Sequence, residues 1–274
     1  MIDADAAVLS NYSLRFVGPE ERFDAAHRAG FRAVGFGVRQ FREAEDSGAS
    51  ASSLRRLADR CDVTVSEIEA LKPWWGDAGD KGPALDAEDT AWRMADAFGS
   101  RYVQAIGSYS GTLDDAAEAF ARVCDRAGEH GAVVGIEFLP FTNIPDAATA
   151  AAIVDAAGRP NGGVCVDVWH HFRGARDPEM IRNLTRRRIA AVQVDDGPAA
   201  AEGDDYYTDC LENRRVPGEG EFDLVAFIRL LDEMQVDIPV SLEVISTELQ
   251  MLPPVEAAGR IRRGFVRVLE EARA

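Results

Sequence analysis

The sequence predicts an α/β fold, a (β/α)8 TIM barrel that forms a single domain over residues 1–274. Short apolar runs alternate with helical patterns along the whole chain, which gives about eight strand–helix units. The runs lack a regular polar alternation, as expected for parallel strands that are covered on both faces. No linker or low-complexity segment interrupts the pattern. Strict alternation at this chain length fits a closed barrel better than an open doubly wound sheet.

The elements of the first half are predicted from apolar runs and from apolar residues spaced three and four apart. Leu54, Leu57 and Ala58 follow the helical spacing, and Gly99 and Gly131 mark helix ends. The helix before Gly99 is expected to have Asp86 as its N-cap. The predicted elements are strand 6–10, helix 19–29, strand 33–37, helix 53–61, strand 63–68, helix 85–98, strand 102–106 and helix 113–130.

The second half repeats the pattern but contains one long polar segment, residues 197–221. A loop of this length inside a compact domain is usually a functional lid or binding loop. The predicted elements are strand 133–140, helix 146–157, strand 163–167, helix 178–184, strand 189–195, helix 222–234, strand 239–245 and helix 255–272.

The composition limits the partners and the compartment. A formal net charge of −17 argues against a nucleic-acid groove and against binding to an anionic membrane. No run approaches the roughly 18 apolar residues of a transmembrane helix, and no secretion signal is recognised. The four cysteines are scattered without a CxxC pair, as in reduced cytosolic proteins. We therefore expect a cytoplasmic protein with a small-molecule substrate; a homo-oligomer stays open.

Four successive strands each deliver a polar side chain near their C-terminal end: Glu137, Asp167, Gln193 and Glu243. Any one of them could be a hydrogen-bonded polar group of the interior. Buried charges, however, cost several kcal/mol unless they are paired or bind metal, and active sites of such barrels lie at these strand ends. We therefore expect the four to converge on one divalent ion. Oxygen ligands favour Mn²⁺ or Mg²⁺, with Co²⁺ or Zn²⁺ as alternatives.

Five stretches of the sequence resemble the xylose-isomerase-like TIM-barrel family of sugar isomerases and epimerases. They are 136–140 (IEFLP), 166–170 (VDVWH), 192–197 (VQVDDG), 214–220 (RRVPGEG) and 242–244 (LEV). The family includes inosose isomerase, ketose 3-epimerases and 3-dehydroshikimate dehydratase. The resemblance implies that the four residues above are metal ligands and that His170 and Arg214 contact the substrate. Isomerases and epimerases usually carry histidine where this chain has Gln193, and dehydratases carry glutamine.

The predicted reaction is isomerisation or epimerisation of an unphosphorylated sugar, keto-sugar, inosose or other cyclic polyol. A metal-bound carbonyl would stabilise the enediolate left by proton removal, with Glu137 and Glu243 transferring protons. The alternative is a lyase or dehydratase in which His170, with an ordinary pKa of about 6.5, protonates the leaving group. A non-catalytic binding subunit on the same fold is the third reading.

The remaining candidates are less specific. Trp74 and Phe36 are predicted to contact the substrate. The alternative for Trp74 is a hydrophobic patch packed against its loop or a partner subunit, and the alternative for Phe36 is the barrel core. Asp195 follows Gln193 by two residues and shares its strand face, so it is expected to orient a ligand or Arg214. Of Glu67 and Glu69, we expect one to face the barrel mouth and the other the helices.

Overall fold

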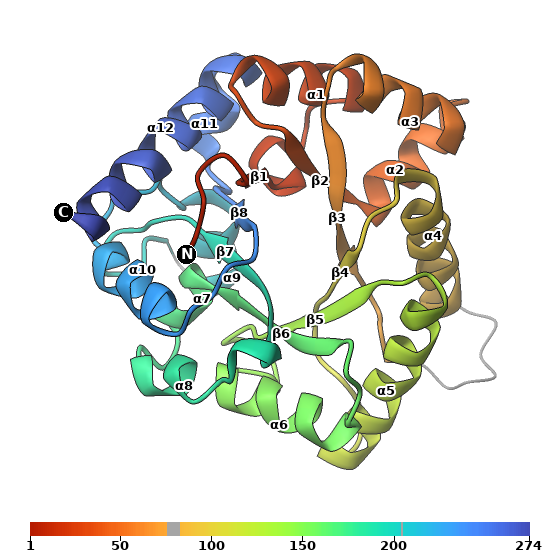
Figure 1. Cartoon of the computed structure of the whole chain (residues 1–274), viewed down its shortest axis with the longest axis vertical. Helices are drawn as coiled ribbons and strands as arrows, with labels where there is room; N and C mark the ends of the chain where they lie inside the picture. Colours follow the sequence, from red (N-terminus) through yellow and green to blue (C-terminus); the bar gives the residue numbers. More distant parts are fainter. Residues whose placement is uncertain (76–82, 204) are drawn as a thin grey trace.

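The chain forms a closed barrel of eight parallel strands arranged in sequence order, with β1 paired to β8. The structure is a computed structural model that describes residues 1–75, 83–203 and 205–274. Figure 1 shows the helices arranged as a ring around the strands. The predicted (β/α)8 barrel is confirmed.

Most predicted elements are present, with boundaries that differ by a few residues. The strands are β1 Val8–Leu9, β2 Ala33–Gly37, β3 Thr64–Leu71, β4 Tyr102–Ala105, β5 Val133–Glu137, β6 Gly162–Asp167, β7 Ile189–Val194 and β8 Val240–Leu242. The helices are α1 Pro19–Arg28, α2 Val38–Asp46, α3 Ala51–Arg60, α4 Pro83–Phe98, α5 Leu113–Glu129, α6 Ala147–Ala157, α7 Val168–Arg173, α8 Pro178–Arg182, α9 Tyr206–Glu212, α10 Leu224–Glu233, α11 Thr247–Gln250 and α12 Pro254–Arg273. Two 3₁₀ helices complete the fold, η1 Asn11–Leu14 and η2 Arg186–Arg188.

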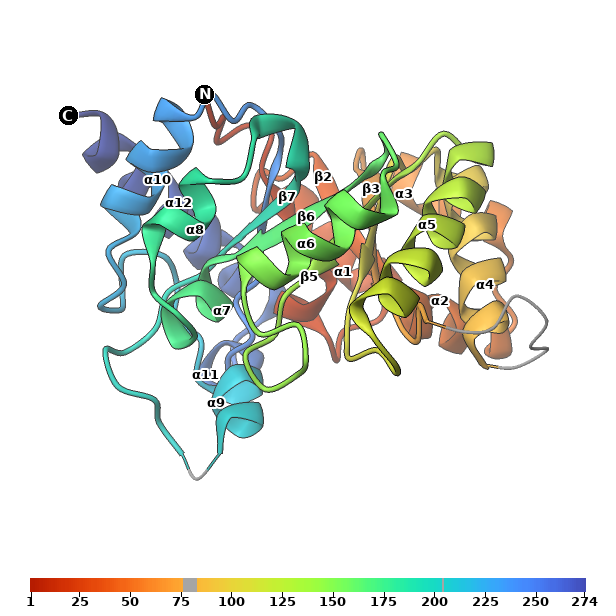
Figure 2. The ribbon, with the colours of Figure 1, turned by 90° about the horizontal axis from the view of Figure 1, so that it is seen from below.

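Several short helices were not predicted, because they contain too few turns to show a periodic apolar face. Helix α7 begins directly after β6, and the Asp167 carboxylate that ends the strand accepts a hydrogen bond from Trp169 N–H as the helix N-cap. Helix α9 lies inside the long polar segment expected to be a loop. The Asp86 prediction was wrong, because α4 begins three residues earlier, at Pro83. Figure 2 shows α9 and α11 at one end of the barrel and both chain termini at the other.

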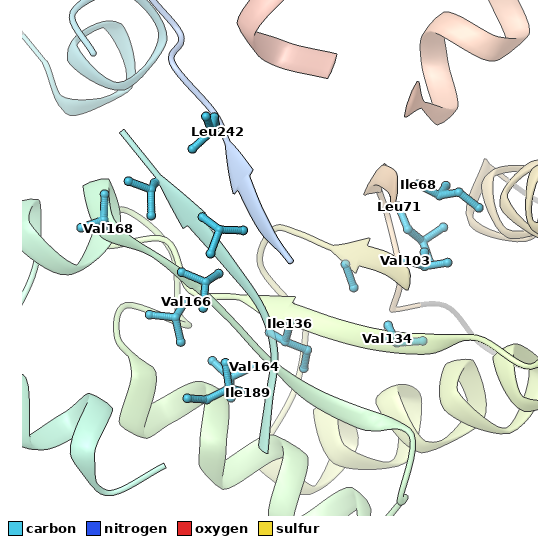
Figure 3. Packing of buried hydrophobic residues seen from close by; sticks show 14 of the residues in the cluster. Ile68, Leu71, Val103, Val134, Ile136, Val164, Val166, Val168, Ile189 and Leu242 are labelled. Carbon is cyan, nitrogen blue, oxygen red and sulfur yellow. The ribbon is translucent and has the colours of Figure 1, made fainter. Parts of the chain in front are cut away.

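The apolar core fills the layer between strands and helices, whereas much of the barrel interior is polar. Ile136, Val166 and Leu242 belong to the buried apolar cluster (Figure 3). Because strand side chains alternate, their neighbours Glu137, Asp167 and Glu243 face the barrel interior. That interior also holds the buried side chains of Glu67, Glu69, Gln104 and Cys165. A barrel lumen of this kind is usually packed with branched apolar residues, so its polarity marks a functional region.

Candidate metal centre at the barrel mouth

The structure places the four predicted metal ligands at the C-terminal ends of neighbouring strands. Glu137 and Asp167 are the last residues of β5 and β6, Gln193 is the penultimate residue of β7, and Glu243 directly follows β8. None of the four side chains belongs to a residue that is more than 4% exposed. The carboxylates are therefore removed from bulk water, where a charge must find a partner.

His170 completes a group that could hold a cation. It lies one helical turn after Asp167 on α7, so the two side chains share a face. Its Nε2 atom is 3.3 Å from Glu137 Oε1 and 3.6 Å from Asp167 Oδ2. One ligand atom each from Glu137, Asp167 and His170 lie within 4.8 Å of one another. On its other side, His170 Nδ1 lies 3.0 Å from the hydroxyl oxygen of Tyr206 on α9.

Arg214 lies among the acidic residues and is only 1% exposed. Its Nη1 atom donates to Asp167 Oδ2 at 2.9 Å, to Asp195 Oδ2 at 2.6 Å and to Glu243 Oε2 at 3.1 Å. Asp195 thus holds Arg214, one of the two roles expected for it. The guanidinium already donates hydrogen bonds to three carboxylates. It could contact substrate only if some of these bonds were given up or shared with the substrate.

Gln193 is tied to Glu137 by a residue that the sequence analysis missed. Gln104 on β4 donates from Nε2 to Glu137 Oε2 at 2.9 Å and to Gln193 Oε1 at 3.3 Å. The Cys165 thiol also donates to Gln193 Oε1, at 3.3 Å. The strand position of Gln104 was the available signal, because a glutamine within the short apolar strand Tyr102–Ala105 is as unusual as the four residues that were noticed.

The electrostatics of the group follow from burial and from one guanidinium. Burial raises the pKa values of Glu137, Asp195 and Glu243 well above their usual range, and Arg214 opposes this. For Asp167, burial also raises the pKa, but Arg214 and His170 outweigh it, so the pKa is lowered. Burial lowers the pKa of His170 to about 4. The expected role of His170 as an acid assumed a near-neutral pKa, and the pKa of this buried ring is lower.

The residues fit a divalent cation. Four buried carboxyl groups lie here, and the guanidinium of Arg214 pairs with three of them, those of Asp167, Asp195 and Glu243, whereas Glu137 has no ion pair with it. This leaves an excess of acidic groups in a region that water does not stabilise, and additional positive charge would balance it. Carboxylate and amide oxygens with one imidazole nitrogen form a donor set that divalent ions accept.

Two predicted substrate contacts lie in packed regions. Phe36 on β2 is fully buried and makes edge-to-face contacts with Phe23, Phe41 and Phe98 in the helix layer. Trp74 is 1% exposed and packs edge-to-face against Phe120 of α5. Phe36 thus packs in the apolar core, as its alternative had it, and Trp74 packs against helix α5, while the contact of either residue with substrate stays a prediction.

Both acidic residues of β3 face the interior, so the prediction that they face opposite sides was wrong. They are two residues apart in a regular part of the ladder, where Gly35 to Gly37 pair with Glu67 to Glu69, and therefore share one face. A Cβ atom on Gly35 would lie 1.5 Å from Glu69 Oε1, which places the Glu69 carboxylate in the space left by that glycine.

A family model described as the xylose isomerase-like TIM barrel matches residues 23–266, and the chain belongs to this family. The inosose isomerase of Bacillus velezensis is 29% identical over 142 residues, 51% of this chain and 49% of that protein. The 3-dehydroshikimate dehydratase of Pseudomonas putida is 27% identical over 154 residues, 54% of this chain and 23% of that protein. The chain thus spans about half of one relative and about a quarter of the other.

The fold is shared with a solved structure described as the IolI protein with a bound zinc atom. The TM-score is 0.84 at 18% identity, and the match covers 96% of this chain and 98% of that one. Both named relatives are enzymes, one an isomerase and one a dehydratase. Within the described ranges, no helix is long and apolar enough to cross a membrane.

Proposed function

We propose that this protein is a divalent-metal-dependent isomerase or epimerase of an unphosphorylated sugar, keto-sugar or inosose. The observation that carries the proposal is the buried group of Glu137, Asp167, His170 and Glu243 at the barrel mouth, with its excess of acidic groups. Membership of the family and the likeness to an inosose isomerase support a reaction on a sugar-like carbonyl compound.

We assign the cation to Glu137, Asp167, Gln193 and Glu243, with His170 Nε2 beside the first two. When bound, a divalent cation would polarise the substrate carbonyl and make the neighbouring carbon more acidic. Mn²⁺ or Mg²⁺ suits the oxygen donors, and Co²⁺ or Zn²⁺ would suit a site that also uses the imidazole nitrogen.

The proton transfers are assigned to Glu137 and Glu243. They come from β5 and β8, which are separated by two strands of the ring, so they approach a substrate from different sides. Each would act as a base in its ionised form, and burial, which raises the pKa of both groups, makes them more basic. The His170 ring and the Arg214 guanidinium lie in the same region, and we assign to them contacts with substrate hydroxyl or carbonyl oxygens.

Proton exchange in D₂O tests this function. Purified protein with added Mn²⁺ would be incubated with keto-sugars, inososes and 3-dehydroshikimate, and the products followed by NMR. We expect deuterium at the carbon next to the carbonyl without loss of water. A Glu137→Gln variant should lose the exchange and take up less Mn²⁺. Wild-type protein that contains and binds no divalent ion would contradict the proposal.

The second candidate is a metal-dependent lyase or dehydratase, which Gln193 and the likeness to 3-dehydroshikimate dehydratase favour. In this reading a hydroxyl group leaves the carbon beside the one that has lost its proton. The conjugated or aromatic product would absorb in the near ultraviolet, whereas an epimer would not. Growth of that absorbance with 3-dehydroshikimate, without exchange into any keto-sugar, would select the lyase.

A further inference from the structure

Next to the proposed metal centre, a second buried carboxylate is connected to Glu243 through one hydroxyl group. Ser10, directly after β1, has its Oγ atom 2.9 Å from Glu69 Oε2 and 3.3 Å from Glu243 Oε1. Ser10 is fully buried and Glu69 is 1% exposed. The three residues come from the C-terminal ends of β1, β3 and β8, so they link the strands on the far side of the mouth from Asp167.

The surroundings hold Glu69 in this place. Its Oε1 atom accepts the Asn11 backbone N–H at 2.8 Å, and Arg22, 1% exposed, donates to the Asn11 side-chain oxygen. Gly35 leaves the space that the carboxylate occupies. A buried carboxyl group costs several kcal/mol, and an apolar side chain would fill the same space without that cost. The N–H group, the hydroxyl and the glycine that surround Glu69 therefore point to a role beyond core packing.

The number of protons at Ser10 limits which group donates each of its hydrogen bonds. The Tyr12 backbone N–H donates to Ser10 Oγ at 3.1 Å, so the hydroxyl is an acceptor there and has one proton of its own to donate. Ser10 Oγ lies within hydrogen-bond distance of both carboxylates but has a single proton. Two full two-centre hydrogen bonds therefore require that one carboxyl group is protonated and donates to Ser10, while Ser10 donates to the other. A cation ligand must be ionised, so the proton belongs to Glu69.

We propose that Glu69 is a positioning residue that, as the neutral acid, acts through Ser10 to orient the Glu243 carboxylate towards the cation. The inference rests on the proposed function only in taking Glu243 as a cation ligand. Burial raises the pKa of Glu69 to about 7, above the usual range of a carboxyl group. Partners of this kind commonly change metal affinity or activity about 10–100-fold when removed.

Four variants test the inference, with Mn²⁺ alone as the probe and its Kd measured by calorimetry or by electron paramagnetic resonance of free Mn²⁺. Ser10→Ala and Glu69→Ala should each weaken binding by about 10–100-fold, and the double variant by no more than either. Glu69→Gln should stay within about threefold of wild type, because its amide accepts from Asn11 and donates to Ser10 as the neutral acid does.

Glu67→Ala is the matched control. Glu67 is a buried glutamate on the same strand and face, one layer deeper in the barrel, and its truncation removes the same atoms. It should lower the thermal midpoint much as Glu69→Ala does, with an unchanged Kd for Mn²⁺.

Each result decides something. Glu69→Ala with wild-type affinity, or Glu69→Gln as weak as Glu69→Ala, would overturn the positioning role and leave the proposed function standing. Equal weakening by Glu67→Ala would reduce the role of Glu69 to general stability. If wild-type protein binds no Mn²⁺, the metal centre itself is wrong and the inference is overturned with it.

Discussion

The titration of Glu67 tests how strongly the barrel interior disfavours a charged carboxylate. Its side chain is 6% exposed, and burial raises its pKa from the usual 4.5 to about 8. Replacement by glutamine keeps the size and shape of the neutral acid and removes the titration. We therefore expect Glu67→Gln to be more stable than wild type at alkaline pH and nearly equal to it at acidic pH.

The sign follows from proton binding. Between pH 4.5 and about 8, the folded chain keeps the Glu67 proton and the unfolded chain has released it. The stability of wild type therefore falls as the pH rises, by about 1.4 kcal/mol per pH unit, and levels off above the folded-state pKa. Over this window the difference from Glu67→Gln grows to a value on the order of 5 kcal/mol.

Urea denaturation from pH 4 to pH 9, with a chelator present so that no cation occupies the mouth, would measure this difference. Other carboxyl groups of the interior titrate in both proteins and cancel when the two curves are subtracted. Glu270→Gln on the exposed surface of α12 is the control and should run parallel to wild type. A Glu67→Gln curve that also runs parallel to wild type would refute the claim that this carboxyl group is neutral in the folded barrel.

Two further predictions concern the packing of the structure. Gly35→Ala should destabilise the fold by about 1–3 kcal/mol, because its Cβ would overlap the Glu69 carboxylate. The control is Gly18→Ala, where the new Cβ has open space and the urea midpoint should change little. Equal effects of the two substitutions would contradict the prediction. Of the four thiols, Cys61 is half-buried while Cys124, Cys165 and Cys210 are buried, and burial raises the pKa of Cys124 to about 12. Cys61 should therefore react with a disulfide reagent at pH 8 before the other three thiols, and all four should react after unfolding. Fast reaction of Cys124 in the native chain would contradict the packing of α5.

The barrel and the clustering of four candidate residues at its mouth could be predicted because a charged or amide group in a short apolar strand is visible locally; their role as metal ligands stays a prediction. Glu137, Asp167 and Glu243 each interrupt such a run, and the chain order of the strands brings their ends together. The same period of two placed Asp195 beside Gln193 correctly. It was not applied to Glu67 and Glu69, which share a face for the same reason.

Other parts of the site depend on contacts that no local pattern encodes. Tyr206 reaches His170 because α9 folds back over the mouth from the segment after β7, and Ser10 meets Glu243 because β1 closes the barrel against β8. The Ser10–Glu243 contact depends on closure of the ring, whereas the Tyr206–His170 contact depends on how the segment after β7 folds over its neighbour. The length of the polar segment indicates a functional loop but not which residue it brings to His170, and a lone serine after a strand carries no signal of its own.

The choice between isomerase and lyase shows the same limit at one position. Gln193 suggests the lyase when it is read alone, but in the structure its oxygen accepts from both Gln104 and Cys165, and Gln104 also binds Glu137. The glutamine is therefore one member of a hydrogen-bonded set rather than an isolated replacement for histidine. A Gln193→His variant would place a ring against Gln104 and Cys165, which are arranged to donate to an oxygen, so the identity of this ligand was set together with its neighbours. We therefore expect Gln104 and Cys165 to restrict which side chain can stand at position 193.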